Sequence, residues 1–133
     1  MTILGFTYLF TNNIKEMKLF YESFLGLELI WDETDDIAFK IGDHQLSVTF
    51  HEEFKVQSAH FAIQPGWQGG TLPRTSWSIA YDSSRFKKTV RALSENNVKS
   101  YYMTPQRKEY WSYPVLDPMN NTIEITCSDS NCS

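Results

Sequence analysis

The sequence is poor in the features that mark several large classes of protein. Among its 133 residues only two are cysteines, Cys127 and Cys132. A disulfide between them would close a very short loop and stabilise the fold little, so we expect two reduced thiols in a cytoplasmic protein. Their spacing matches no zinc-binding motif.

Long apolar runs and clustered positive charge are missing as well. No stretch approaches the roughly 18 consecutive apolar residues of a membrane helix. The opening segment MTILGFTYLF has neither basic residues nor a small-residue cleavage site, so it predicts a strand rather than a signal peptide. The net charge is -4 and no face rich in Lys and Arg stands out. We therefore expect no nucleic-acid partner and no membrane association.

Aromatic side chains, in contrast, are abundant. They make up 15% of the chain, as four Trp, seven Tyr and nine Phe. This surplus fits a cavity or an interface lined with rings, and it fits equally an aromatic core. The length predicts one domain over residues 1–133, large enough to bury a core without the help of disulfides or bound metals.

The first half of the chain predicts a strand, a helix and three further strands. Asn13 is a suitable N-cap with Glu16 as its capping-box partner, and Gly26 supplies the left-handed residue at the helix end. The helix has an apolar stripe of Ile14, Met17, Phe20, Tyr21, Phe24 and Leu25. The predicted strands are 3–10, 27–31, 37–41 and 46–50.

The second half repeats this order. A polar break at Asp82-Ser83-Ser84 precedes a helix with an apolar face of Phe86, Val90 and Leu93. The predicted strands are 77–81, 98–103, 111–116 and 122–126.

A shift of about seventy residues superimposes the two halves, which indicates a duplicated unit. It places Asn13 on Ser84, Gly26 on Asn97 and Leu27 on Val98. The boundaries that follow are module 1 at about 1–54, a connector at about 55–74, module 2 at about 75–127 and a tail at 128–133. Trp67, in the middle of the connector, either caps a pocket or pins the loop to the body.

Two motifs stand out in this order of elements. One is Phe20-Tyr21 followed by Leu25-Gly26-Leu27. The other is the hairpin Asp117-Pro118-Met119-Asn120-Asn121 followed by Ile123-Glu124. Both resemble motifs of the glyoxalase/bleomycin-resistance/dioxygenase (vicinal oxygen chelate) superfamily, except that Asn120, which can also adopt a positive φ, replaces the usual glycine. The resemblance implies an α+β fold in which two βαβββ modules form a curved mixed sheet around a cup.

In metalloenzymes of this superfamily, four side chains of the cup bind a divalent cation. Carried over to this sequence, their positions are Phe6, Ser47, Trp77 and Glu124. Only Glu124 is a good ligand, because aromatic rings of this kind offer no lone pair and a serine hydroxyl binds metals weakly. A shift of one residue brings in Gly5, Thr7, Ser76 or Ser78, none of which is a usual ligand. We expect no metal and no other cofactor.

Strand alternation gives the cup aromatic walls, a polar stripe and one carboxylate. The predicted ligand-binding residues are Phe6, Tyr8, Ser47, Thr49, His51, Trp77, Tyr81, Tyr113 and Glu124. Stacking favours a flat ligand, and a carboxylate beside rings favours a cationic one. The alternative is that Phe6 and Trp77 pack together and fill the cup.

Three functions remain open from the sequence. The first is a metal-independent binding protein for a small aromatic or cationic compound, similar to the bleomycin-resistance type. The second is a lyase or dioxygenase relative with an atypical site, for which Glu124 and His51 are the acid–base candidates. The third is an interaction domain with a filled cup. The resemblance also implies a homodimer, and a group of rings at Tyr101, Tyr102, Tyr110, Trp111 and Tyr113 suits an interface or pocket walls.

Overall fold

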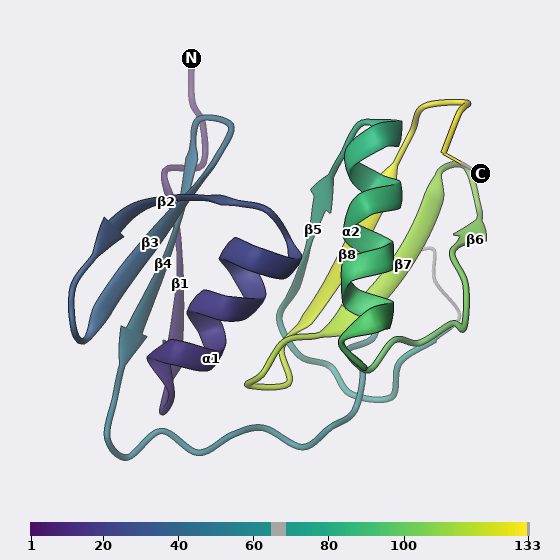
Figure 1. Cartoon of the computed structure of the whole chain (residues 1–133). Helices are drawn as coiled ribbons and strands as arrows, with labels where there is room; N and C mark the ends of the chain where they lie inside the picture. The colour runs from purple at the N-terminus through teal and green to yellow at the C-terminus, as the bar shows by residue number, and fades with distance from the viewer. Residues whose placement is uncertain (65–68, 133) are drawn as a thin grey trace. The chain divides into compact units, whose positions relative to one another are not determined.

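The computed structural model describes residues 1–64 and 69–132 (Figure 1). The chain divides into two compact units, Met1–Val56 (unit 1) and Gln57–Ser133 (unit 2), and each is described by itself. Each unit contains one four-stranded mixed sheet, and the predicted α+β fold of two βαβββ modules is confirmed. The prediction for Trp67 lies outside the described residues.

Unit 1 is a four-stranded sheet with one helix on one face (Figure 1). Its strands follow the order β1-β4-β3-β2, in which β1 is parallel to β4 and the other neighbours are antiparallel. The strands are β1 (Phe6–Thr11), β2 (Glu28–Asp32), β3 (Asp36–Ile41) and β4 (His44–Phe50).

The helix of unit 1 begins at the predicted cap and changes pitch part-way along. The Asn13 Oδ1 atom accepts a hydrogen bond of 3.1 Å from the Glu16 N–H, which satisfies one of the free donors of α1 (Ile14–Lys18). The chain then continues as the π-helix η1 (Leu19–Phe24). Gly26, at φ 68°, ends the helix as predicted. The side chains that this helix buries include Met17, Phe20 and Tyr21.

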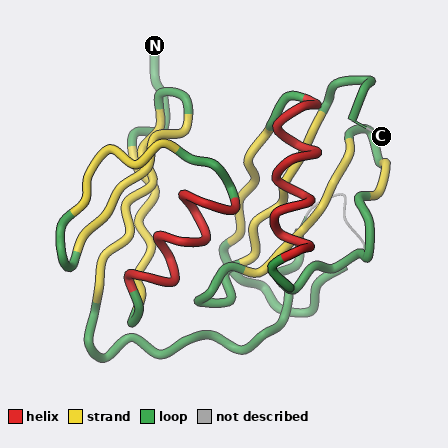
Figure 2. The backbone as a smooth tube through the Cα atoms, in the orientation of Figure 1, coloured by secondary structure: helices red, strands yellow, loops and turns green. Residues whose placement is uncertain are grey.

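Unit 2 has the same plan, with a longer helix (Figure 2). Its strand order is β5-β8-β7-β6, with β5 parallel to β8. The elements are β5 (Ser76–Ala80), α2 (Ser83–Glu95), β6 (Gln106–Arg107), β7 (Trp111–Leu116) and β8 (Thr122–Cys127).

The cap of α2 is Asp82, not the Ser84 that the repeat comparison placed on Asn13. The Asp82 Oδ1 atom accepts a hydrogen bond of 2.8 Å from the Arg85 N–H. Asn97 stands at φ 57° and so has the left-handed conformation of Gly26, as the comparison predicted. The helices therefore end at equivalent residues but begin at shifted ones.

The predicted strand over residues 98–103 is wrong. This segment makes a single bridge, between Ser100 and Val115, and β6 forms further along. The Tyr101 N–H donates to the Pro114 carbonyl at 2.9 Å, but Pro114 has no N–H with which to return the bond. The ladder next to β7 therefore breaks at Pro114.

The hairpin between β7 and β8 has the predicted turn chemistry. Asn120 adopts φ 63°, in the left-handed region. The Asp117 Oδ1 atom accepts hydrogen bonds of 2.9 Å from the N–H groups of Met119 and Asn121. The turn thus satisfies its own backbone donors, as an aspartate at this position can.

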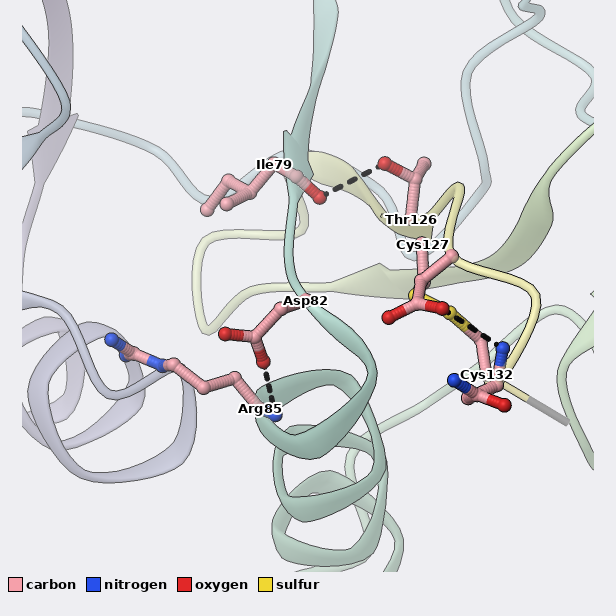
Figure 3. Close-up of a disulfide and its surroundings, with 8 residues drawn as sticks. Ile79, Asp82, Arg85, Thr126, Cys127 and Cys132 are labelled. Atoms are coloured by element: carbon pink, nitrogen blue, oxygen red, sulfur yellow. Dashed lines mark hydrogen bonds between the residues drawn. A yellow bond between two sulfur atoms is a disulfide. The ribbon is translucent and has the colours of Figure 1, made fainter.

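The expectation of two reduced thiols is wrong, since Cys127 and Cys132 form a disulfide (Figure 3). After β8 the chain turns back, with the Cys132 N–H donating to the Asp129 carbonyl at 3.3 Å. This turn brings the two Cα atoms to 6.2 Å, a usual separation for a disulfide. The short loop between the two cysteines predicts that a disulfide stabilises the fold little. Whether the disulfide forms depends instead on the turn, which brings the two sulfur atoms together. As for membrane spans, none of the helices in the described residues has the length and apolar character to be one.

Candidate functional site

The sheet of unit 1 has one face against the helix and one open face. Leu46 and Val48 of β4 are fully buried on the helix side. Their neighbours Gln45, Ser47 and Thr49 point the other way and are in register with residues of β1. The β1 residues concerned are Phe6, Tyr8 and Phe10, which pair with them in that order.

Exposed rings dominate this open face. Phe6 is 51% exposed, Tyr8 67% and Phe10 49%. Across the sheet, Ser47 is in register with Ala38, and Ala38 with Trp31, which is 53% exposed. Two small side chains therefore separate Tyr8 from Trp31 along one row of the sheet. We call Phe6, Tyr8, Phe10 and Trp31 the aromatic face.

The aromatic face has polar groups beside it and a cavity at one end. The rings of Phe6 and Tyr8 lie 6.0 Å apart, and the His51 ring meets the Phe10 ring edge-on at 6.3 Å. The cavity, of about 420 Å³, has Phe6, Ile30, Lys40 and Gln45 among its lining residues.

Five of the predicted ligand-binding residues therefore belong to the open side of unit 1, namely Phe6, Tyr8, Ser47, Thr49 and His51. Trp31 was missed. Its place follows from a bulge in β2 between Leu29 and Trp31, which sequence alternation alone does not reveal.

Three other predicted site residues lie on the helix side of the unit 2 sheet, opposite to the face that carries Glu124. Trp77 is in register with Ile123, and Tyr113 with Ile125, and both isoleucines are fully buried. The Tyr81 ring packs beside helix α2 rather than in a cup. The guanidinium carbon of Arg85, a residue of α2, lies 5.6 Å from the centre of the Tyr81 ring. Burial raises the pKa of Tyr81 to about 12, against the opposing influence of Arg85 and of a hydrogen bond with Thr89.

For Trp77 and Tyr81, the misplacement follows from a difference of one residue in the repeat. The comparison used one shift for the whole repeat, taken from residues at the ends of the helices. The sheet registers show that Tyr8 pairs with Ser47 as Ser78 pairs with Glu124. The counterpart of Phe6 is therefore Ser76 rather than Trp77. A slip of one residue moves every side chain of a strand to the opposite face.

Glu124 lies on the face of the unit 2 sheet that is turned away from α2, where the whole of β8 is buried, and it has partners that the sequence did not reveal. The Ser112 hydroxyl donates to the Glu124 Oε2 atom at 2.5 Å. The Lys108 ammonium lies 3.5 Å from the same oxygen, and the Tyr110 hydroxyl lies 3.4 Å from both carboxylate oxygens. The residue is only 7% exposed. We call Lys108, Tyr110, Ser112 and Glu124 the carboxylate cluster.

The cluster also changes the chemistry of its phenol. Partial burial first, and the neighbouring Glu124 carboxylate second, raise the pKa of Tyr110 above its ordinary value. The phenol is therefore held as a donor toward the carboxylate. Counting outward from the predicted hairpin would have placed Ser112 on the face of Glu124, whereas Lys108 and Tyr110 precede β7 and follow no such pattern.

Comparison with known proteins assigns the chain to a family. The model of the Glyoxalase/Bleomycin resistance protein/Dioxygenase superfamily matches residues 3–125. The chain belongs to this superfamily. No curated protein matches the sequence significantly.

Solved structures of the superfamily share the fold at low identity. A glyoxalase/dioxygenase from Nostoc punctiforme is 18% identical, with a TM-score of 0.74 over 96% of this chain and 92% of that one. A lactoylglutathione lyase from Agrobacterium tumefaciens is 17% identical, with a TM-score of 0.65 over 96% and 94% of the two chains. A fosfomycin resistance protein from Mesorhizobium loti is 11% identical, with a TM-score of 0.64 over 97% of this chain and 93% of that one. At such identities the likeness shows the fold alone.

The positions that hold a cation in metalloenzymes of the superfamily do not suit a cation in this chain. With the corrected register they are Phe6, Ser47, Ser76 and Glu124. Phe6 has no lone pair, the two serines are weak ligands, and Glu124 already faces the Lys108 ammonium. Among the described residues, no three His, Cys, Asp or Glu side chains come together. We derive no step through a metal.

Proposed function

We propose that this chain binds a small, flat aromatic compound without a metal ion, and that the aromatic face of unit 1 supplies the stacking surface. The observation that carries the proposal is the row of exposed rings on β1. Their exposed fractions run from 49% to 67%, although large apolar side chains in strands are usually covered. An exposed apolar patch of this kind marks an interaction or ligand-binding surface.

The neighbouring groups support a ligand with polar edges. Gln45, Ser47 and Thr49 stand next to the rings on β4, and the Gln45 amide donates to the Ser47 hydroxyl at 3.0 Å. These side chains offer donors and acceptors to a heterocycle that stacks on Tyr8. Stacking contributes most when such groups fix the orientation of the ring.

A positive charge on the ligand receives less support than the sequence suggested. The expected counter-ion was Glu124, and Lys108 already neutralises it within unit 2. A cationic ligand would have to displace this ammonium from a carboxylate that also accepts the bond from Ser112. We therefore favour an aromatic ligand over a cationic one.

Isothermal titration calorimetry with a panel of flat heterocycles, neutral and cationic, tests the proposal. We expect at least one neutral member to bind, and Tyr8→Ala to weaken its binding about tenfold, the loss of roughly one stacking contact. Addition of EDTA should leave the affinity unchanged.

Phe50→Ala is the matched control, because Phe50 lies in the same sheet with 37% exposure and pairs with Thr11 rather than with the aromatic face. It should bind as the unaltered chain does. Equal losses in the Tyr8 and Phe50 variants, or abolition of binding by EDTA, would contradict the proposal. So would a panel without a single binder.

A further inference from the structure

A second cavity lies on the helix side of unit 2, opposite to the sheet face that carries Glu124. It has a volume of about 320 Å³, within the range of small-molecule sites. Its apolar lining comprises Phe86, Val90, Met103, Pro105, Tyr113 and Cys132. These residues come from α2, from the segment before β6, from β7 and from the turn after β8.

The disulfide keeps the last of these walls in place. Cys127, at the end of β8, is fully buried, and Cys132, which borders the cavity, is 3% exposed. The bond between them holds the turn of residues 128–132 against the unit. The cavity is thus bounded by covalently fixed backbone on one side and by a regular helix on another.

The polar rim of the cavity is basic. Lys87 and Arg91 are four residues apart on α2, so they lie on one side of the helix, and both border the cavity and are exposed. Lys87 acts on Asp129, whose carboxyl has its pKa lowered mainly by the Asn131 N–H and also by Ser83 and Lys87. Within the described part of the chain, Arg91 makes no ion pair.

An apolar cavity with a guanidinium at its rim suits one kind of ligand. We propose that this cavity binds an amphipathic anion, with its apolar body against Val90, Met103 and Pro105 and its carboxylate or sulfonate at Arg91. Lys87 adds positive charge at the same rim, partly offset by Asp129. Arg91 suits this role because its planar fork can give two hydrogen bonds to one carboxylate.

The test uses octanoate as probe, with octylammonium as a probe of the same length and opposite charge. In calorimetric titrations at low ionic strength we expect octanoate to bind and octylammonium to bind at least tenfold more weakly. Arg91→Glu should weaken octanoate about tenfold or more, because it replaces an attraction by a repulsion. Val90→Phe, which fills the cavity and leaves the charges intact, should also abolish octanoate binding.

Lys88→Glu is the matched control, since Lys88 is an exposed cation of the same helix that does not border the cavity. It should change octanoate affinity less than twofold, and Tyr8→Ala in unit 1 should not change it. The proposal is overturned if octanoate does not bind, if octylammonium binds equally well, or if the Lys88 and Arg91 variants lose affinity alike. Each of these results is independent of the aromatic face.

Discussion

Glu124 shows how neighbouring side chains compensate a buried carboxylate. It is only 7% exposed. A buried carboxylate needs compensation, because leaving it unpaired in a medium of low dielectric constant is costly. Lys108 supplies the positive charge and Ser112 the hydrogen bond. The side chains of unit 2 thus satisfy this carboxylate among themselves.

Tyr81 leads to a prediction about alkaline pH. Its pKa is raised from 10.0 to about 12, chiefly by burial, so the folded state retains a proton that the unfolded chain releases above pH 10. Stability is therefore fully present below about pH 10 and falls as the pH rises toward 12, by roughly 2–3 kcal/mol from this residue. Urea unfolding at several alkaline pH values measures this loss.

Tyr81→Phe should flatten the decline, because phenylalanine has no proton to release. Tyr8→Phe serves as the control, since Tyr8 is 67% exposed and should leave the pH dependence as it is in the unaltered chain. A Tyr81→Phe variant with an undiminished loss of stability would show that other groups cause the decline.

At the level of elements, the sequence correctly predicted those caps and turns that depend only on neighbouring residues. The Asn13 cap, the left-handed Gly26 and Asn97, and the turn at Asn120 depend on neighbouring residues, and all are as predicted. The face of β5 was mispredicted, because it depends on how many residues separate the strand from its helix. The polar break at Asp82-Ser83-Ser84 marks the start of α2, but nothing in it singles out Asp82 over the two serines as the cap.

Pro114 gives a prediction about strand length. It accepts a bond from Tyr101 but cannot return one, which ends the pairing of the segment before β6. In a Pro114→Val variant, the new amide should donate to the Tyr101 carbonyl. Hydrogen exchange should then show a protected amide at position 114 and slower exchange in residues 101–103. With Pro105→Val as control, these residues should exchange at the rate of the unaltered chain. Rapid exchange at position 114 would mean that another constraint ends the strand.

At the level of the whole molecule, the duplication explains the scaffold better than the site. The two units repeat one strand order, β1-β4-β3-β2 and β5-β8-β7-β6, and this repetition was visible in the sequence. The sheet faces turned away from the helices differ, with exposed rings in unit 1 and the buried carboxylate cluster in unit 2. The sequence pattern predicts the caps, turns and strand order. It does not predict the positions of Trp31, which depends on a bulge in β2, and of Lys108, which lies in a loop before β7. That residues 1–133 form a single domain stays a prediction.

The assembly of the chain gives the last prediction. We expect a homodimer, as the resemblance to the superfamily implies, and unit 1 has a surface suited to it. β1 is an edge strand of its sheet, and its exposed Phe10 can contact another chain while Tyr8 stays available to the proposed ligand. An edge strand with exposed rings readily pairs with another chain. Sedimentation velocity over a range of concentrations should therefore detect a dimer. Phe10→Glu should shift the chain toward monomer, because a carboxylate loses its hydration in such a contact, whereas Phe50→Glu should do so far less. A monomer at all concentrations would count against both the dimer and this role for β1.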